Sequence, residues 1–457
     1  MRNTLALVFC LLFFPQLGMT GDSPPNILLI IADQHTGSVM TQRGYQHITT
    51  PGIDKIADEG VTFTRAYTTY PVCKAYRKSV MTGMMPSKVP EATQQPSIGK
   101  TLSDAGYETV YHGKWHVGET RISKVADWHG FETYDGRQND TTTRERVVDF
   151  IKQKHDRPFF LVTSFMNPHD ACELARNMSG IEDDYKDMPV EENAAIELTP
   201  PLPANFEIPE NEAEGFSLRR GSEPGTKMFE KHPTKYWTKD QWRQYMYGYD
   251  RLLEMVDAHI KLVIDELENQ GLLENTVIIY TSDHGDGHAS HKWNQKMTFY
   301  EEAINVPFVV SWKGKTRAGY LDESTLASTG LDIFPTILRF AGVPVPESLY
   351  GLDLVPRVLA DPAGEALPER KYVVSEINQA KFKGRMVVSQ DYKYILFDGG
   401  ANPEQLFDLV NDPGELRPVT YNPEYKEQLI AHRNMLLEWD KKIDDSDFDP
   451  VGRFPGE

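Results

Sequence analysis

Polar and metal-capable side chains stand just after four apolar runs of the sequence. The runs and the residues that follow them are 26–32 before Asp33-Gln34, 108–111 before His112-Gly113-Lys114-Trp115-His116, 158–165 before Asn167-Pro168-His169-Asp170, and 275–282 before Asp283-His284-Gly285. Each run has the composition of a strand buried on both faces of a parallel sheet. Because ligands of open α/β sheets bind at the carboxyl ends of the strands, we expect these side chains to line a site.

Two of these residues, Asp33 and Asp283, could bind a divalent cation. An acid directly after a strand is more often the cap of the next helix. Here two acids end two strands, and His284 follows one of them. This combination favours a metal site. His288 and His291 come shortly after that pair, and the sequence leaves open whether they contact a substrate or lie in a solvated loop.

Cys73 lies among positive charges. Lys74, Arg77 and Lys78 follow it closely, which argues against the usual interpretation of a free cysteine as a buried structural thiol. If a helix begins at Cys73, Arg77 lies one turn later on the same face. The amino terminus of such a helix would also favour a bound anion.

Helical patterns separate the four runs and predict the fold class. They cover residues 51–59, 97–105, 143–154 and 240–270. Strands that alternate with helices indicate an α/β fold with a large, mostly parallel, doubly wound sheet and helices on both faces. Residues 175–239 are rich in Pro, Glu, Asp and Asn and are expected to form a loop-rich insertion.

The last part of the chain has a different pattern. Short strands are predicted at 371–375, 385–388 and 392–397, and a helix at 423–442. They indicate a small antiparallel sheet with a terminal helix. We therefore expect a catalytic domain over residues 22–362 and a small subdomain over 363–457.

The amino terminus and the composition indicate export. Residues 1–21 have a positive charge, a short apolar core and small residues at the end, which is typical of a secretory signal peptide, with an uncleaved anchor as the alternative. Because no later run is long enough to span a bilayer, we expect a secreted or periplasmic protein without a membrane segment. The 67 acidic and 48 basic residues give a net charge of -19, which disfavours binding to nucleic acid or to anionic membranes.

Cysteine usage excludes a disulfide framework. If the segment that contains Cys10 is removed, Cys73 and Cys172 remain, so at most one bridge could form. A chemical modification of Cys73 would leave Cys172 unpaired.

The segment around Cys73 resembles a known signature. Its residues are Pro71-Val72-Cys73-Lys74-Ala75-Tyr76-Arg77-Lys78-Ser79-Val80-Met81-Thr82-Gly83. This resembles the signature of the type I, formylglycine-dependent sulfatases of the alkaline phosphatase-like superfamily, Cys-x-Pro/Ala-x-Arg followed by Met/Leu-Thr-Gly. Ala75-Tyr76 stand where most members have Pro-Ser. Further matching blocks follow in the family's order: Asp33-Gln34, Gly113 to Gly118, Pro168-His169, Ser282 to Gly285, and Lys296 before Phe299 to Glu302.

The resemblance implies a cofactor and a metal. Cys73 would be oxidised to formylglycine, whose hydrated aldehyde attacks sulfur with one hydroxyl and expels sulfate through the second. The family's metal ligands correspond here to Asp33, Gln34, Asp283 and His284, together with the modified Cys73. Many members have Asp and Asn in place of Gln34 and His284. The oxygen-rich set suits Ca²⁺ or Mg²⁺, while the imidazole also admits Mn²⁺ or Zn²⁺; we expect Ca²⁺.

The resemblance also implies roles for five further residues. Arg77 would hold the hydrated aldehyde, and Lys114 and Lys296 would bind the sulfate oxygens. His116 would act as the base that breaks down the sulfated intermediate, and His169 as the acid that protonates the leaving oxygen.

The predicted function is hydrolysis of a sulfate monoester on a carbohydrate. The expected partners are a sulfated carbohydrate or another sulfate ester, and a formylglycine-generating or anaerobic maturation enzyme. One alternative is a phosphonate or phosphate monoester hydrolase, because such relatives share an Asp-Gln and Asp-His metal set. The other is a non-catalytic binding protein with an unconverted Cys73.

Overall fold

The computed structural model describes most of the chain between residues 24 and 454. The described ranges are 24–88, 96–117, 128–136, 139–181, 190–191, 193–218, 220, 233–360, 369–378, 381–445, 448 and 454. The predicted signal peptide, residues 1–21, lies outside them, and so do parts of the predicted insertion at 175–239. No helix within these ranges is both long and apolar enough to cross a membrane.

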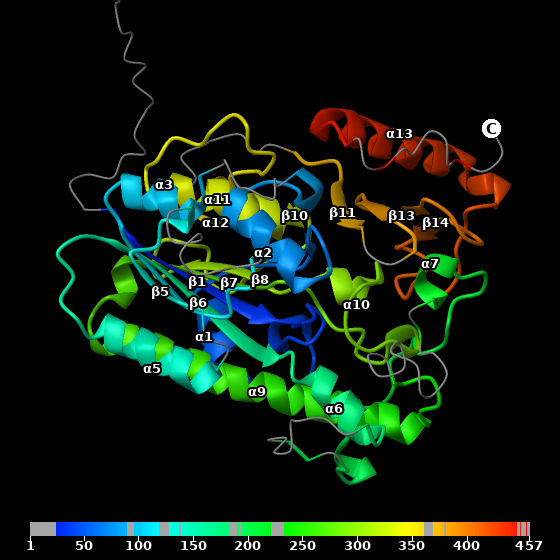
Figure 1. Ribbon diagram of the computed structural model, residues 1–457, viewed down its shortest axis with the longest axis horizontal. Helices are drawn as coiled ribbons and strands as arrows, with labels where there is room; N and C mark the ends of the chain where they lie inside the picture. The colour runs from blue at the N-terminus through cyan, green and yellow to red at the C-terminus, as the bar shows by residue number, and fades with distance from the viewer. Residues whose placement is uncertain are drawn as a thin grey trace, which may run out of the picture.

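A large mixed sheet organises the molecule (Figure 1). Its strands follow the order β5-β4-β6-β1-β7-β8-β2-β9. Neighbours from β5 to β7 run parallel, β8 is antiparallel to both β7 and β2, and β9 is parallel to β2. The bounds are β1 Asn26–Asp33, β2 Gly60–Phe63, β4 Glu108–Gly113, β5 Thr133–Asp135, β6 Phe159–Pro168, β7 Thr276–Ser282, β8 Phe308–Trp312 and β9 Tyr320–Asp322. The four predicted strands are therefore the centre of the sheet, and the predicted α/β class is confirmed.

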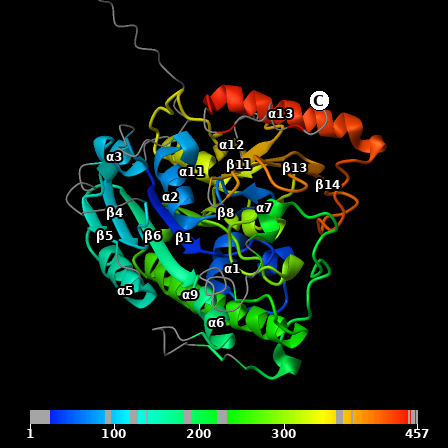
Figure 2. The same ribbon diagram turned by 45° about the vertical axis from the view of Figure 1, so that its right-hand side comes forward.

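Helices cover both faces of this sheet (Figure 2). One face carries α1 Pro51–Asp58, α5 Asp140–Ile151, α6 Ala171–Met178 and α9 Lys239–Asn269; the other carries α2 Cys73–Thr82, α3 Ile98–Asp104, α11 Thr329–Phe340 and α12 Val355–Val358. Alternate residues of β1 enter the two cores: Leu28 and Ile30 pack with the first set, Leu29 and Ile31 with the second. This double burial is the physical reason for the continuous apolar run in the sequence.

Two helix starts depend on caps. The Thr238 side chain accepts a hydrogen bond from the Gln241 backbone, and the Gln241 side chain accepts one from the Thr238 backbone, so a capping box starts α9 within one residue of the prediction. The predicted start of α5 at residue 143 is wrong by three residues. Asn139 caps the helix through the Thr142 N–H, so α5 begins at Asp140.

A second, antiparallel sheet follows in the order β11-β12-β13-β14. Its strands are β11 Val373–Ile377, β12 Gly384–Val388, β13 Tyr392–Phe397 and β14 Glu404–Asp408, and α13 Lys426–Ile443 covers one face (Figure 1). The small sheet with a terminal helix is confirmed, with β14 as an additional strand. The sequence pattern did not predict β14 because this strand begins with the polar residues Glu404 and Gln405. Glu404 is buried there because Arg433 donates two hydrogen bonds of 2.7 Å to its carboxylate.

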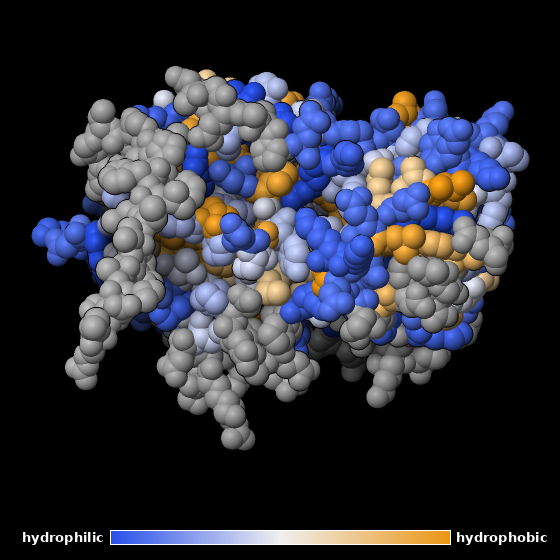
Figure 3. All heavy atoms as spheres, turned by 90° about the horizontal axis from the view of Figure 1, so that it is seen from above, coloured by the Kyte–Doolittle hydropathy of each residue, from blue (hydrophilic) through white to orange (hydrophobic). Residues whose placement is uncertain are grey.

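The remaining elements are short. They are β3 Ala66–Tyr67 and β10 Ala327–Ser328, which pair with each other, the helices α7 Glu214–Ser217 and α10 Glu301–Ile304, and the 3-10 helices η1 Thr41–Arg43, η2 Pro86–Lys88, η3 Ile196–Leu198, η4 Leu273–Asn275, η5 Ser290–Lys292 and η6 Pro423–Tyr425. The face seen in Figure 3 is mostly hydrophilic, with hydrophobic side chains in small groups.

Candidate active site

The predicted site residues meet at the carboxyl ends of four adjacent parallel strands. Asp33 ends β1, Lys114 follows β4, His169 follows β6 and Asp283 follows β7. β1 lies between β6 and β7, and β4 lies beside β6. Parallel pairing therefore brings to one edge residues that are far apart in the sequence.

Four side chains form a compact group of metal-capable atoms. Asp33, Cys73, Asp283 and His284 are buried, and one ligand atom of each lies within 4.8 Å of the others. Oδ1 of Asp33 and Nε2 of His284 have no hydrogen-bond partner among the described residues. Because buried polar atoms are nearly always paired, these two free acceptors fit a bound cation. The donor set of carboxylates and one imidazole is suited to a divalent ion.

Buried cations neutralise the other oxygen of each carboxylate. Lys114 Nζ is 2.6 Å and Arg77 Nη2 3.3 Å from Oδ2 of Asp33, and Arg77 Nε is 3.0 Å from Oδ2 of Asp283. The Oδ1 atoms of both acids instead lie 3.8 and 3.6 Å from Nε2 of His284. Each acid thus has one oxygen paired with cations and one oxygen directed into the group.

The two acids affect each other's ionisation. Burial alone would raise the pKa of Asp33, but the charges of Lys114 and Lys296 hold that pKa well below its usual value. Burial and the negative charge of Asp33 raise the pKa of Asp283 to about 7. A divalent cation between the acids would offset their repulsion and keep both ionised.

Arg77 is fixed by its position on α2. The helix begins at Cys73, as the sequence suggested, and Arg77 follows one turn later. Its Nη1 donates hydrogen bonds to the Lys114 carbonyl at 2.7 Å and to Ser164 Oγ at 2.6 Å. With both acids also in contact, the guanidinium is bound on all sides and cannot readily rotate away.

Three further predicted residues surround Cys73 and Asp33. Lys296 Nζ is 3.6 Å from Cys73 Sγ. Burial and Asp33 raise the pKa of Cys73, yet the nearby Lys296, His116 and His284 outweigh them and leave this pKa well below its usual value. Burial, with the charges of Lys296 and Lys114, lowers the pKa of His169. The neutral imidazole of His169 therefore lies beside a strongly positive pair.

Gln34 is positioned by an acid that the sequence analysis did not single out. Asp286 Oδ2 accepts a hydrogen bond of 2.8 Å from Gln34 Nε2 and another of 2.8 Å from the Tyr245 hydroxyl. The amide nitrogen is thereby committed to Asp286, and Oε1 of Gln34 lies 3.4 Å from Lys296 Nζ. The only sequence signal was an acid two residues after His284, a position that has no distinctive pattern.

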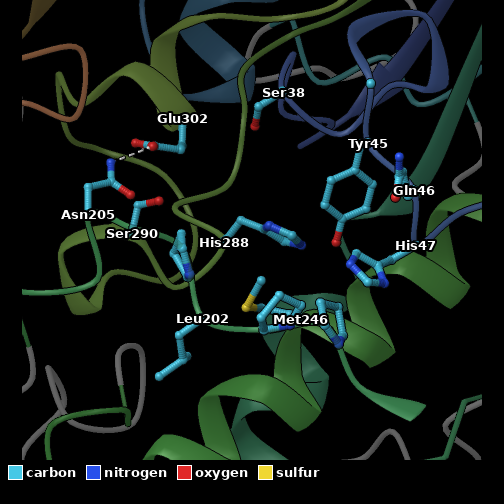
Figure 4. Close-up of a pocket in the computed structure, with 14 residues that line it drawn as sticks. Ser38, Tyr45, Gln46, His47, Leu202, Asn205, Met246, His288, Ser290 and Glu302 are labelled. Atoms are coloured by element: carbon cyan, nitrogen blue, oxygen red, sulfur yellow. Dashed lines mark hydrogen bonds between the residues drawn. The ribbon is translucent and has the colours of Figure 1, made fainter. Parts of the chain in front are cut away.

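The two histidines beyond the metal pair are not solvated loop residues. His288 is 5% exposed and His291 is 0% exposed. His288 Nε2 lies 3.2 Å from Asp250 Oδ1, and its ring packs on Tyr45 and Tyr249. His288 also lines a cavity of about 400 Å³ with residues 200–203 of the insertion (Figure 4).

Comparisons with known proteins cover nearly the whole described chain. The sulfatase family model matches residues 25–343, and the model of the C-terminal region of N-sulphoglucosamine sulphohydrolase matches residues 289–442. The Delta 4,5-hexuronate-2-O-sulfatase of Bacteroides thetaiotaomicron is 28% identical over 442 residues, which cover 91% of this chain and 88% of that protein.

Solved structures agree in fold. A 2-O GAG sulfatase aligns with a TM-score of 0.79 at 26% identity and covers 94% of this chain and 96% of its own. The phosphonate monoester hydrolase of Agrobacterium radiobacter aligns with a TM-score of 0.73 at 21% identity, with 92% and 96% covered. That second likeness shows a shared fold and no more.

Proposed function

Because the chain belongs to the sulfatase family and is a sulfuric ester hydrolase, we propose that it removes sulfate from a carbohydrate by means of a formylglycine at position 73 and a bound Ca²⁺ ion. The observation that carries this proposal is the placement of Cys73. It stands at the start of α2, within 4.8 Å of the ligand atoms of Asp33, Asp283 and His284.

The cofactor and the metal fit the residues present. Formylglycine, once formed, supplies a hydroxyl nucleophile and a route by which sulfate can leave. Asp33, Gln34, residue 73, Asp283 and His284 would hold the metal, which polarises a sulfate oxygen and lowers the pKa of the nucleophile. Ca²⁺ accepts such a carboxylate-rich, irregular set more readily than Mg²⁺ does.

The chain's own cations would bind and orient the sulfate group. Lys114 contacts Asp33 Oδ2, and Lys296 lies 3.6 Å from Cys73 Sγ. Fixed cations in a site shielded from water stabilise the charge that develops on the sulfate oxygens. Arg77 would keep residue 73 and both acids in register.

Two histidines would move the protons. His116 makes a hydrogen bond with Cys73, so it can accept a proton from a hydroxyl at that position. His169 lies near both lysines and is neutral in their field. An anionic sulfate bound between the lysines would offset that field, raise the pKa of His169 and allow it to protonate the leaving oxygen.

The carbohydrate substrate is proposed from the relatives' chemistry. The Delta 4,5-hexuronate-2-O-sulfatase and the 2-O GAG sulfatase act on sulfated sugars by their names. A secreted or periplasmic location and maturation by a formylglycine-generating or anaerobic enzyme are part of the same proposal. The support for export is the signal-like segment at residues 1–21.

The test compares protein made with and without a formylglycine-generating enzyme. Tryptic cleavage yields the peptide 66–74, and mass spectrometry of this peptide should show loss of the Cys73 sulfur in the co-expressed sample alone. Sulfate release from sulfated uronic acids and amino sugars should follow the converted fraction. Parallel assays with aryl sulfate, phosphate monoester and phosphonate monoester decide the rival activity. A preference for phosphorus, or equal activity with the unconverted thiol, would overturn the proposal.

A further inference from the structure

A second group of metal-capable side chains lies between the main sheet and the C-terminal sheet. His291 belongs to η5, Glu302 to α10, and Glu415 to the segment after β14. One ligand atom of each lies within 4.8 Å of the others. None of the three belongs to the group around Cys73, so this is a separate cluster.

Unpaired polar atoms mark this cluster. Nδ1 of His291 and Oε2 of Glu302 are buried and have no hydrogen-bond partner among the described residues. The His291 ring makes a hydrogen bond with the Glu207 backbone carbonyl, and Asn205 Nδ2 lies 3.4 Å from its Nε2. Since Nδ1 has no partner among the residues that the structure describes, Nε2 is the nitrogen that donates to the carbonyl, and Nδ1 then carries the lone pair of the neutral ring. Burial, together with Arg220 and Lys393, lowers the pKa of His291 to about 3, so its ring is neutral. A neutral imidazole is the form that binds metals.

The local charge is also incomplete. Lys393 Nζ lies 2.6 Å from Glu415 Oε1 and 2.8 Å from Glu301 Oε2. Glu302 adds a third carboxylate and has no ion pair with a cation in the described part of the chain. Lys393 therefore pairs with two of the three acids, and Arg65 and Arg43 also act on Glu301. The Glu302 carboxylate has no such partner among the described residues, and buried charge of one sign is unfavourable unless a counter-charge is present.

The neighbouring residues hold the three side chains in place. His291 stacks on Tyr300 with ring centroids 3.8 Å apart and an angle of 19° between the ring planes. The Glu301 N–H donates a 2.7 Å hydrogen bond to Glu415 Oε2, so Oε1 faces the cluster. Asn205 Nδ2 donates to Glu302 Oε1 at 2.9 Å (Figure 4). Such outer contacts are typical of metal ligands.

We propose that His291, Glu302 and Glu415 bind a divalent transition metal ion, Zn²⁺ or Mn²⁺, that fastens the C-terminal sheet to the segment after β7. An imidazole with two carboxylates favours these ions over Ca²⁺. Glu302 and Asn205 also line the cavity of about 400 Å³, so one ligand of the proposed site lies beside it (Figure 4). Because the three ligands come from three separate segments, a bound ion would link these segments.

The experiment uses the full-length chain, stripped of metal with a chelator and titrated with Zn²⁺ by calorimetry. Asp33→Asn impairs the group around Cys73, and Glu302→Gln impairs the proposed site. We expect Asp33→Asn to retain one Zn²⁺ per chain and the double variant to retain none. Zn²⁺ should raise the melting temperature of Asp33→Asn but not that of the double variant. The matched control combines Asp33→Asn with Glu323→Gln, which replaces an exposed acid elsewhere on the surface.

Two results would overturn the inference. Asp33→Asn could bind no Zn²⁺, or the double variant could bind and be stabilised as strongly as Asp33→Asn. Both readouts are independent of sulfatase activity, because every Asp33→Asn protein is expected to be inactive. A failure here would leave the proposed function untouched, and a failure to convert Cys73 would leave this site untouched.

Discussion

Replacing Asp286 by Asn should weaken metal binding at the active site although no metal ligand is itself replaced. The carboxylate is fully buried and accepts four hydrogen bonds. Oδ2 accepts from Gln34 Nε2 at 2.8 Å, from the Tyr245 hydroxyl at 2.8 Å and from the Gln295 N–H at 3.0 Å; Oδ1 accepts from the His288 N–H at 2.8 Å. An Asn side chain has one acceptor oxygen, and its NH₂ group takes the place of the other oxygen. The NH₂ group must therefore face an N–H or O–H donor.

The cost follows from this count. If the oxygen serves the three donors, the His288 N–H faces the new NH₂ group, and a buried unpaired donor costs about 1–3 kcal/mol. The three bonds that stay lose the assistance of the charge, about 1 kcal/mol each. The protein no longer buries a carboxylate, which offsets part of the loss. We expect the free energy of unfolding to fall by about 2–4 kcal/mol.

The functional effect comes through Gln34. With a neutral partner, its amide can flip and direct NH₂ instead of Oε1 towards Lys296 and residue 73. Loss of an outer contact of this kind lowers metal affinity by about 10–100-fold. The assay is sulfate release by the metal-stripped enzyme at increasing free Ca²⁺, where the half-saturating concentration should rise by that factor while the rate at saturation changes less.

Asp250→Asn is the matched control. Asp250 is equally buried and contacts His288 and the Tyr45 hydroxyl, but it does not contact Gln34. It should lower stability without changing the Ca²⁺ requirement. If Asp286→Asn shows the stability loss with an unaltered Ca²⁺ requirement, the proposed role of Gln34 as a positioned ligand is wrong.

Further predictions concern packing, pH and thiol chemistry. Gly113 has a φ of +103°, and a Cβ there would lie 1.9 Å from a backbone oxygen, whereas a Cβ at Gly271, with a φ of +67°, would meet open space. Gly113→Ala should therefore lower the free energy of unfolding by about 3 kcal/mol or more, and Gly271→Ala by about 1 kcal/mol. Thermal denaturation measures both. Burial lowers the pKa of His432, so the folded protein binds fewer protons than the unfolded chain, and the stability present above pH 6.5 is lost as the pH falls. Urea unfolding at pH 7 and at pH 5 should show a smaller loss of stability for His432→Gln than for the unsubstituted protein. Burial raises the pKa of Cys172 to about 12, so iodoacetamide at pH 8 should label it in denaturant and not in the native enzyme.

The sequence carried most of the information on where the chemistry lies. Strands buried on both faces are continuous apolar runs, so their ends are visible, and polar residues such as Asp33 and Asp283 stand out after them. Parallel pairing then brings these ends together without further information. The start of α2 at Cys73 was an expectation, and the structure confirms it, so Arg77 lies one turn after Cys73.

What the sequence could not show depends on contacts between distant segments. The sequence around Asp286 is typical of a loop, and only the tertiary structure shows that Gln34 and Tyr245 donate hydrogen bonds to its carboxylate. Glu415 is one of 67 acidic residues, and only the tertiary structure brings it close to His291 and Glu302. The local sequence around a polar residue does not show whether its side chain is buried, because that depends on a partner from a distant segment.

The charge of the active site resolves the apparent conflict between a net charge of -19 and an anionic substrate. Around residue 73, two acids, Asp33 and Asp283, meet three cations, Arg77, Lys114 and Lys296. These five groups carry one excess positive charge, and a divalent ion adds two more, which exceeds the single negative charge of a sulfate monoester. Salt screens exposed charges beyond about 8–10 Å, while buried charges interact strongly at contact distance. The surface acidity therefore governs solubility, and the few buried cations govern sulfate binding.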